Sequence, residues 1–285
     1  ESALPDSLPP GFIAWPQALA ETRPPRPDIS RSDDLCVMPY TSGTTGKPKA
    51  CMHTHHSVLF TAFVQARWYV YDDDTVLTGF MPMFHVAGMQ LSLNGCAACG
   101  ATVVIMARWD RDLVAPLFRR YGVTLYSAAP TMVVDALAAE GFDDAAFARL
   151  KIITGGGAAM PAAVAAELKR RWNLSYVEGY GLTETMSPSH LNPVDRPKPQ
   201  CLGVPVQETD ARIIDPVTLV ELPQGETGEI VVAGPQVMRG YWNRPEATAE
   251  AFVTLDGKRF LRTGDLARVD EDGYFHMVDR LKRMI

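Results

Sequence analysis

The sequence predicts an α/β protein, in which a helix-covered, mostly parallel sheet is followed by a small β-rich, barrel-like subdomain. Up to about residue 187, short apolar stretches with strand character alternate with helix-like stretches, which is typical of a parallel sheet covered by helices. Five prolines then fall within residues 188–205, and the stretches beyond them are strand-like. A chain of 285 residues with 47% hydrophobic content can bury a core of this size.

In the first region, expected strands and helices follow one another. Apolar residues recur at helical spacing within residues 57–70. Residues 161–172 combine a proline in the first turn with Val164, Leu168 and Trp172 at i, i+4 and i+8. The expected strands cover residues 35–38, 75–80, 101–106, 124–127, 151–154 and 175–178.

The second region is expected to be antiparallel. Its strands should cover residues 211–214, 229–232 and 260–261, followed by a hairpin of residues 266–270 and 274–278 around Glu271-Asp272-Gly273. The sequence thus divides into a proline-rich connecting segment (1–34), an α/β region (35–199) and a β-rich subdomain (200–279).

Charge and hydropathy narrow the classes of function. The net charge of −6 disfavours a nucleic-acid partner, since such proteins usually carry a basic face. The longest apolar stretch, residues 95–107, is too short and too rich in glycine to span a bilayer. The beginning of the sequence has no signal-peptide pattern.

The cysteines and histidines favour structural roles. Five cysteines without framework spacing indicate a reducing cytoplasm and no disulfides. Cys96 and Cys99 have the spacing of a zinc half-site, but their neighbours are apolar and no second pair exists, so two small buried side chains are favoured. The cluster of His53, His55 and His56 similarly indicates a polar helix entry rather than a metal site.

One loop carries the strongest functional signal. Residues 40–49, Tyr-Thr-Ser-Gly-Thr-Thr-Gly-Lys-Pro-Lys, combine glycines, hydroxyls and lysines between an expected strand and an expected helix. Glycines let backbone N–H groups face phosphate oxygens, hydroxyls donate to the same oxygens, and lysine supplies positive charge. The P-loop of common ATPases is excluded, because it needs four residues between its glycines and a Ser or Thr after its lysine. A flexible linker fits the flanking elements poorly.

The loop is similar to the phosphate loop of the adenylate-forming enzymes, which include acyl-CoA synthetases, aryl-CoA ligases, luciferases and peptide-synthetase adenylation domains. Four further motifs resemble this superfamily in the same order, and the resemblance covers residues 35–285. These motifs are Gly179-Tyr180-Gly181-Leu182-Thr183-Glu184-Thr185, Gly228-Glu229-Ile230 through Gly240-Tyr241-Trp242, Arg262-Thr263-Gly264-Asp265 and Asp279-Arg280-Leu281-Lys282. The superfamily's N-terminal segment and C-terminal lid domain are not matched, and residues 280–285 fall where the hinge to that lid is expected.

The resemblance implies ATP, Mg²⁺ and CoA as cofactors and co-substrates. An acid would attack the α-phosphate to give an acyl-adenylate and pyrophosphate, and CoA would then displace AMP. Expected catalytic residues are Lys49, Thr183, Glu184 and His85, with Glu184 as the Mg²⁺ ligand, because Mg²⁺ keeps most of its waters and takes one or two carboxylates. The expected nucleotide contacts are Thr41, Ser42, Gly43, Thr44, Thr45, Gly46, Lys49, Gly156, Gly157, Ala158, Tyr180, Gly181, Thr183, Asp265 and Arg280.

Several of these residues also allow a structural interpretation. Tyr180, between two glycines, can stack on adenine or be a core aromatic residue. Asp265 can accept from both ribose hydroxyls or cap its turn. Glu184 can be a metal ligand or a surface glutamate. A histidine among apolar residues is often structural, but the family places one like His85 beside the substrate carboxylate.

The nature of the acid is the least determined part of the prediction. Small residues 155–159 and the apolar Val86, Met89 and Met132 favour an uncharged acyl pocket, and hence a fatty acid. A 4-coumarate-like or benzoate-like aryl acid is the alternative, and a nucleotide-binding module without turnover is a second one. The expected partners are therefore small molecules, with no nucleic acid and no transmembrane segment, and a homo-oligomer is left open.

Overall fold

A computed structural model describes residues 10, 12–20, 29–41, 47–139 and 141–281. The chain consists of two compact units, residues 1–31 and 32–285. Within the described part of the first unit lies the helix α1 (Trp15–Ala20). All the elements discussed below belong to the second unit.

A sheet of seven strands forms the centre of the second unit, in the order β4-β3-β5-β6-β7-β8-β9. The pairs that join β4 through β7 are parallel, and β8 and β9 are added antiparallel. The strands expected at residues 75–80, 101–106, 124–127, 151–154 and 175–178 are therefore confirmed as parts of a mostly parallel sheet, whereas the one expected at residues 35–38 lies outside it. Its strands are β3 (Val76–Gly79), β4 (Thr102–Ile105), β5 (Leu125–Ser127), β6 (Ile152–Gly156), β7 (Tyr176–Leu182), β8 (Ser187–Leu191) and β9 (Val204–Pro205).

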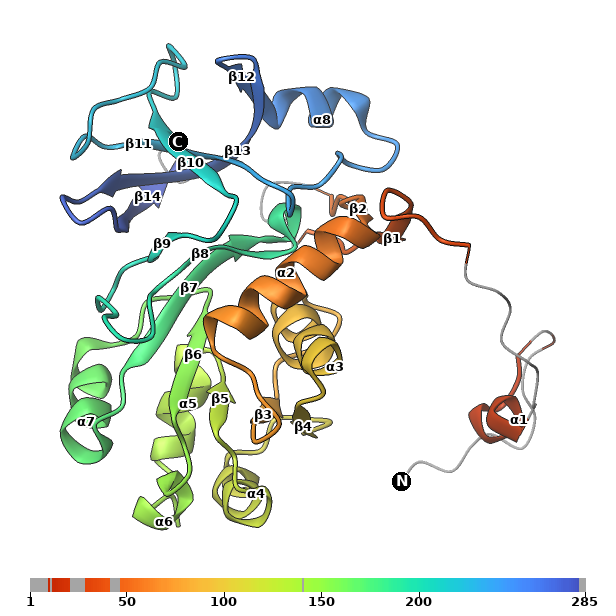
Figure 1. Ribbon diagram of the computed structural model, residues 1–285, viewed down its shortest axis with the longest axis vertical. Coiled ribbons are helices and arrows are strands. Elements are labelled where there is room, and N and C mark those ends of the chain that lie inside the picture. The colour runs from red at the N-terminus through yellow and green to blue at the C-terminus, as the bar shows by residue number, and fades with distance from the viewer. Residues whose placement is uncertain (1–9, 11, 21–28, 42–46, 140, 282–285) are drawn as a thin grey trace. The chain divides into compact units, whose positions relative to one another are not determined.

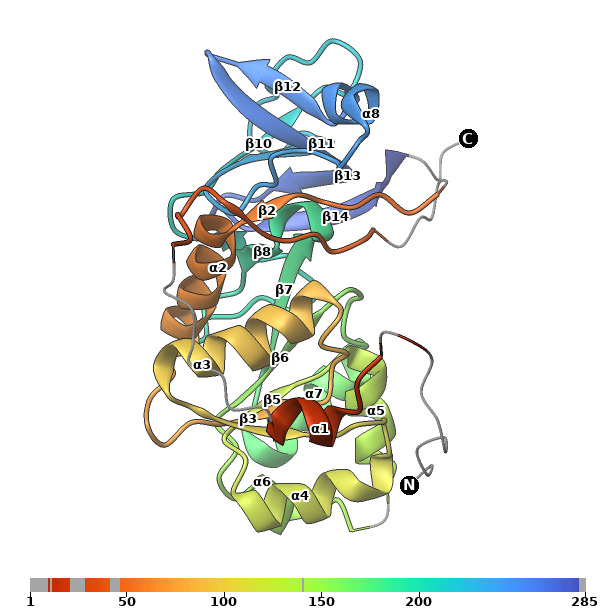
Figure 2. The ribbon, with the colours of Figure 1, turned by 90° about the vertical axis from the view of Figure 1, so that its right-hand side faces the viewer.

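Helices cover both faces of this sheet, as Figures 1 and 2 show. The α-helices are α2 (His55–Trp68), α3 (Gly95–Cys99), α4 (Val114–Tyr121), α5 (Pro130–Leu137), α6 (Asp144–Phe147) and α7 (Ala162–Trp172). The helices expected at residues 57–70 and 161–172 are thus confirmed with small shifts. Shorter helical turns are the π-helix η1 (Gly88–Asn94) and the 3₁₀ turns η2 (Arg111–Leu113) and η3 (Thr183–Thr185).

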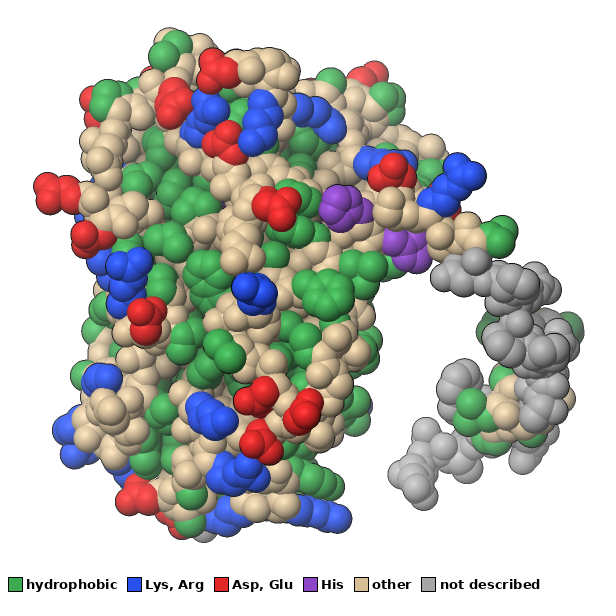
Figure 3. Space-filling view, viewed as in Figure 1, with side chains coloured by type: hydrophobic (Ala, Val, Ile, Leu, Met, Phe, Trp, Pro, Cys, Tyr) green, Lys and Arg blue, Asp and Glu red, His purple; other side chains and the backbone are tan. Residues whose placement is uncertain are grey.

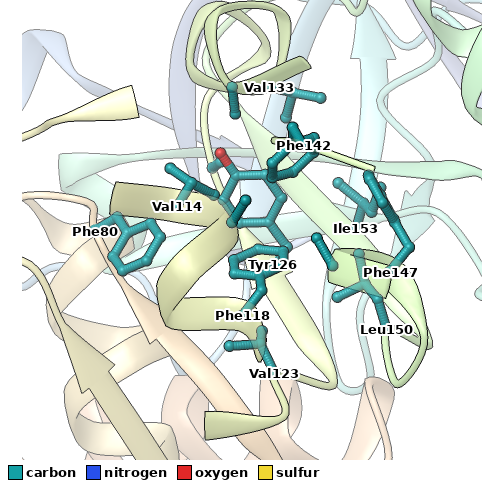
Figure 4. Close-up of a cluster of buried hydrophobic side chains, with 14 of the residues drawn as sticks. Phe80, Val114, Phe118, Val123, Tyr126, Val133, Phe142, Phe147, Leu150 and Ile153 are labelled. Atoms are coloured by element: carbon teal, nitrogen blue, oxygen red, sulfur yellow. The ribbon is translucent and has the colours of Figure 1, made fainter. Parts of the chain in front are cut away.

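The two faces of the sheet build two hydrophobic cores, because successive strand residues point to opposite sides. Tyr126 packs with α4 to α7, and its ring meets that of Phe118 edge-on with centroids 5.1 Å apart (Figure 4). Its neighbour Leu125 packs on the other face with Val64 of α2, with Tyr69 directly after that helix and with Leu91 of η1. The α2 side is the one that reaches the candidate site.

The β-rich part forms a curled antiparallel sheet in the order β10-β11-β13-β12, with β14 paired to β13. The hairpin expected around residues 271–273 is confirmed, with Val269 paired to Phe275. The elements are β10 (Asp210–Ile214), β11 (Gly228–Ala233), α8 (Pro245–Glu250), β12 (Phe252–Leu255), β13 (Lys258–Val269) and β14 (Phe275–Arg280). One strand beyond residue 200, β9, still pairs with β8 of the first sheet.

The two described ends of the phosphate-type loop, residues 40–49, pair with each other, and a short strand that was not expected lies between the loop and the expected helix. Strand β1 (Leu35–Val37) pairs antiparallel with β2 (His53–Thr54), which runs into α2. Nearer the tip, Tyr40 bridges Ala50, and the Thr41 N–H donates to the Lys49 carbonyl at 2.9 Å. The stem therefore fixes where the loop begins and ends.

The surface and cysteines carry no strong signal of their own. On the face shown in Figure 3, acidic and basic side chains of the described residues are interspersed. All five cysteines have free thiols. Within the described ranges, no helix combines the length and the apolar character needed to cross a membrane.

His190 of β8 is a buried, neutral imidazole. Its ring lies between those of Tyr180 and Phe275, with centroids 5.7 Å and 4.4 Å away, and its Nε2 has no partner among the described residues. Burial lowers the pKa of His190 to about 3, because a charge would lose its hydration in this apolar setting.

We expect His190 to make folding sensitive to acid. The native imidazole stays neutral while the unfolded one binds a proton below pH 6.5, so stability is present at neutral pH and is lost as pH falls. Between pH 7 and pH 5 this group should lower the free energy of unfolding by about 2 kcal/mol. Chemical denaturation at both pH values should show that loss in the wild type and a correspondingly smaller one in His190→Leu. Equal losses in the two proteins would contradict the assignment.

Candidate functional site

A cavity of about 1260 Å³ lies where the parallel sheet meets the antiparallel one. Ser127, Thr154 and Leu182 line it at or near the carboxyl ends of β5, β6 and β7, and further lining residues come from the stem of the hairpin. The carboxyl ends of parallel strands are the usual place for ligand sites in such sheets. The antiparallel sheet closes the opposite wall with residues of β11, β13 and β14.

The cavity brings together every sequence-predicted site residue that the structure describes. Ser42, Gly43, Thr44, Thr45 and Gly46 lie outside the described residues. The lining contains Thr41, Lys49, His85, Gly156, Gly157, Ala158, Tyr180, Gly181, Thr183, Glu184, Asp265 and Arg280. Residues more than 200 positions apart in the sequence thus share one cavity.

Lys49 and Glu184 are linked through a tyrosine. The Lys49 Nζ lies 4.1 Å from the centroid of the Tyr241 ring, a distance at which the ring face attracts a cation. The Tyr241 hydroxyl donates to Glu184 Oε1 at 2.6 Å. Burial and the Glu184 carboxylate raise the pKa of Tyr241, so this phenol is a neutral donor. Tyr241 therefore holds a cation and an anion at defined positions while keeping them apart.

The turn that carries Glu184 is fixed from two directions. The Met238 N–H donates to the Glu184 carbonyl at 2.8 Å. His53 Nε2 lies 2.8 Å from the Thr183 carbonyl, which can only accept, so Nε2 carries the proton. Burial lowers the pKa of His53 to about 4. The cluster of His53, His55 and His56 therefore contains one neutral structural histidine.

Asp265 is a buried carboxylate with two donors. Its side chain is 3% exposed. Oδ2 accepts from the Tyr180 hydroxyl at 2.6 Å, and Oδ1 accepts from Arg280 Nε at 2.8 Å. Burial, together with the Asp265 charge, raises the pKa of Tyr180 well above its ordinary value. Tyr180 is thus a core aromatic residue that also lines the cavity, and its stacking on adenine stays a prediction.

A second buried carboxylate shapes the turn before Asp265. Glu229, 2% exposed, accepts from Arg262 at 2.6 Å and from the Gly264 N–H at 3.0 Å. The Thr263 hydroxyl donates to the Ile230 carbonyl at 2.8 Å. These contacts tie residues 262–264 to β11, and so fix the direction in which Asp265 leaves the turn.

The glycines after β6 are required by the sheet itself. A Cβ on Gly155 would lie 2.1 Å from the Ala128 carbonyl oxygen, and one on Gly156 would lie 2.3 Å from the Gly179 oxygen. Gly157 has φ +84 with open space around its Cα, a conformation that favours glycine. Gly155 and Gly156 therefore have a steric cause, and Gly157 a conformational one, besides bordering the cavity.

The expected acid pocket is only partly as predicted. His85 and Val86 line the cavity, and partial burial lowers the pKa of His85. Met89 and Met132 are not among the described lining residues. Met89 packs against Val58, Val86 and Met186, and Met132 packs against the core on the α4 side.

Sequence reasoning missed several residues that line the cavity. Gln65 lies on α2, Tyr69 follows its end and Leu91 lies on η1. The helical spacing of the sequence gave no sign that polar residues here face inward. Tyr241, Glu229 and Arg262 belong to the motifs that resemble the superfamily. Their roles were predictable from the need of buried carboxylates in these motifs for hydrogen-bond donors and partners.

Comparisons with known proteins place this chain in a family. The family model described as AMP-binding enzyme matches residues 4–242. A feruloyl-CoA synthase from Amycolatopsis sp is 40% identical over 258 residues, covering 89% of this chain and 51% of that protein. A long-chain-fatty-acid–CoA ligase from Bacillus subtilis (strain 168) is 35% identical over 262 residues, covering 91% and 46%.

Solved structures agree with this placement. The ATP-bound crystal structure of MatB from Rhodopseudomonas palustris matches with a TM-score of 0.82 and 31% identity, over 88% of this chain and 49% of that one. The chain spans about half the length of the curated relatives it matches. It belongs to the AMP-binding enzyme family.

Proposed function

We propose that this chain forms the nucleotide- and acid-binding part of an AMP-forming acid–CoA ligase. The acid and ATP would give an acyl-adenylate and pyrophosphate, and the CoA thiol would then displace AMP. The observation that carries the proposal is the single cavity that gathers the hairpin stem, Glu184, Asp265 and the glycine edge. The CoA ligases among the relatives support it.

The first half-reaction joins an anionic acid to an α-phosphate already surrounded by negative oxygens. Lys49 and the hydroxyl of Thr41 border the cavity at the phosphate end, where they would stabilise the charge that develops on pyrophosphate. The proposal assigns the neighbouring contacts to Ser42, Gly43, Thr44, Thr45 and Gly46.

Glu184 fits a magnesium ion that keeps most of its waters. Its carboxylate lines the cavity, with one oxygen engaged by Tyr241 and the other free of protein donors among the described residues. One carboxylate beside phosphate oxygens is a usual Mg²⁺ setting. When bound, the ion would neutralise charge on the leaving group.

The nucleoside would lie between the glycine edge and the Tyr180–Asp265 pair. Gly156, Gly157, Ala158 and Gly181 give a surface with few side chains on which a flat base can rest. Asp265, already oriented by two donors, would accept from the ribose hydroxyls, with Arg280 beside it.

The acid remains to be assigned within this scheme. The expectation of a fatty acid rested partly on Met89 and Met132, which are not found in the lining. The names of the relatives include both feruloyl and long-chain acids. His85 lies in the segment that follows β3. We assign it a place beside the substrate carboxylate.

The organisation of the whole protein is also a proposal. Residues 35–199 would bind nucleotide and acid, residues 200–279 would form the closing subdomain, and residues 280–285 would be a hinge to a lid. Lys282 lies outside the described residues. Free thiols suit a reducing compartment, and we place the protein in the cytoplasm.

Acid-dependent exchange between ATP and pyrophosphate tests the function directly. In the full-length protein, Lys49→Ala should lower exchange by about one to three orders of magnitude, because one charge-assisted contact to the leaving group is lost. Lys169→Ala, which removes a lysine from the exposed surface of α7, is the control. Wild-type exchange in Lys49→Ala would contradict the role of the hairpin.

Asp265→Asn tests the nucleoside site. Replacing the carboxylate should weaken AMP binding by about 1 to 3 kcal/mol, the range for losing a charged acceptor of buried hydroxyls. Calorimetry with AMP measures this, and Asp73→Asn in the exposed turn before β3 is the matched control. Equal affinity of Asp265→Asn and the control would remove Asp265 from the ribose site.

Tyr241→Phe tests whether the tyrosine positions Glu184. The ring under Lys49 stays in place while the donor to Glu184 is lost, so the carboxylate should become less ordered. We expect exchange to fall about tenfold, because one hydrogen bond to a charged group is lost. The Mg²⁺ concentration that gives the half-maximal rate should rise. An unchanged Mg²⁺ requirement would show that Tyr241 acts elsewhere.

A further inference from the structure

Two hydrogen-bonding side chains line the cavity away from its phosphate end. Gln65 and Tyr69 lie one turn apart on or directly after α2, and are 3% and 4% exposed. The helix begins at His55, next to the hairpin. A rise of 1.5 Å per residue places Gln65 about 15 Å along it. The steps proposed for the phosphates and the carboxylate make no use of this pair.

The amide of Gln65 presents an acceptor to the cavity. Its Nε2 donates to the Thr61 carbonyl at 3.2 Å, one turn earlier in α2. Because a carbonyl can only accept, this contact fixes which end of the amide is nitrogen. No described residue donates to Oε1 of Gln65. Oε1 is not among the side-chain atoms that are sealed from solvent without a partner, so it reaches the open space of the cavity. A hydroxyl group on a ligand can donate to it there.

The hydroxyl of Tyr69 adds a second acceptor. Thr154 Oγ1 lies 2.8 Å from both the Tyr69 hydroxyl and the Val177 carbonyl. The Val177 carbonyl can only accept, so the single hydroxyl proton of Thr154 is donated to it. The proton between Thr154 and Tyr69 therefore comes from the Tyr69 hydroxyl. The remaining lone pairs of Tyr69 are then available to a donor. Burial raises the pKa of Tyr69 to about 12, which keeps the phenol neutral.

Charge decides which donor fits. The carboxylates that line the cavity are Glu184, Glu229, Glu250 and Asp265. They belong to η3, the antiparallel sheet and α8, and none comes from α2, η1 or β6. An ammonium group beside Gln65 would therefore be desolvated without a counter-ion. A neutral hydroxyl has no such cost.

We propose that the acid carries a neutral hydroxyl at the end remote from its carboxylate, held by Gln65 and Tyr69. This inference rests on the proposed function. Leu91 and Leu191 supply apolar walls, and the side-chain-free edge at Gly155 leaves room for a flat ring. Hydroxyaryl acids and ω-hydroxyalkyl acids share the required chemistry, and the experiment separates them.

The experiment compares acids in pairs by ATP–pyrophosphate exchange in the full-length protein. The pairs are 4-hydroxycinnamate with cinnamate, and 9-hydroxynonanoate with nonanoate. At least one hydroxylated acid should exceed its partner by tenfold or more in kcat/KM, because a site built to bind a hydroxyl rejects the analogue that lacks it. The pair with the larger ratio identifies the ring or the chain.

Variants show whether Gln65 and Tyr69 cause the preference. Gln65→Met keeps the volume and removes the acceptor, so the ratio should fall to about threefold or less, with Tyr69→Phe reducing it partly. Gln90→Met is the matched control. Gln90 is also a fully buried glutamine, but it is not among the described residues that line the cavity, so its variant should keep the wild-type ratio.

The outcomes separate this inference from the proposed function. Exchange that is robust with the unhydroxylated acids and shows no hydroxyl preference would overturn the inference and leave the ligase assignment standing. A hydroxyl preference that survives in Gln65→Met and Tyr69→Phe would overturn it as well. No exchange with any of the four acids would count against the proposed function, and the inference would fall with it.

Discussion

The hydrogen bond between Tyr180 and Asp265 joins the two sheets at the site. Tyr180 belongs to β7 of the parallel sheet and Asp265 to β13 of the antiparallel one, and their oxygens lie 2.6 Å apart in a buried setting. Another buried carboxylate, that of Glu178 of β7, accepts from the Cys201 N–H at 2.8 Å. The Cys201 thiol in turn contacts the Phe275 carbonyl of β14. Breaking either link would leave a buried carboxylate one donor short, which is costly. The position of the cavity wall therefore depends on these two carboxylates.

Much of the fold could be predicted, because its signals are local. The alternation of apolar, strand-like stretches with helix-like ones is sufficient to predict the parallel strands. The turn sequence at residues 271–273 is sufficient to predict the last hairpin. The site residues were predictable for a different reason, since they lie in motifs that resemble a known superfamily. Their convergence on one cavity follows from topology: β5, β6 and β7 are parallel, so their carboxyl ends meet at one edge.

The rest required contacts that no local pattern reveals. The short strand β2 has two residues, too few to show a period of two, so the hairpin was missed. The π-helix η1 turns Leu91 toward the cavity and Met89 toward Val58, whereas hydrophobicity alone marked Met89 as a pocket residue. Gln65 is a polar residue on a helix, and such residues usually face solvent. Only the tertiary structure shows that it is buried.

The steric reasons for the glycines limit where selectivity for the acid can arise. Gly155 and Gly156 have a neighbouring carbonyl oxygen within 2.3 Å of any added Cβ, so that wall cannot be changed without moving a strand. The facing wall is built from side chains of α2 and η1, which can differ in size and polarity while the backbone stays in place. Under the proposed function, a site with one fixed wall and one variable wall could keep the geometry of adenylation while the acid it binds changes. In this chain the variable wall carries Gln65 of α2 and Tyr69 directly after it. Under the proposed function, the choice of acid would therefore be made at the far end of the helix that begins beside the hairpin stem.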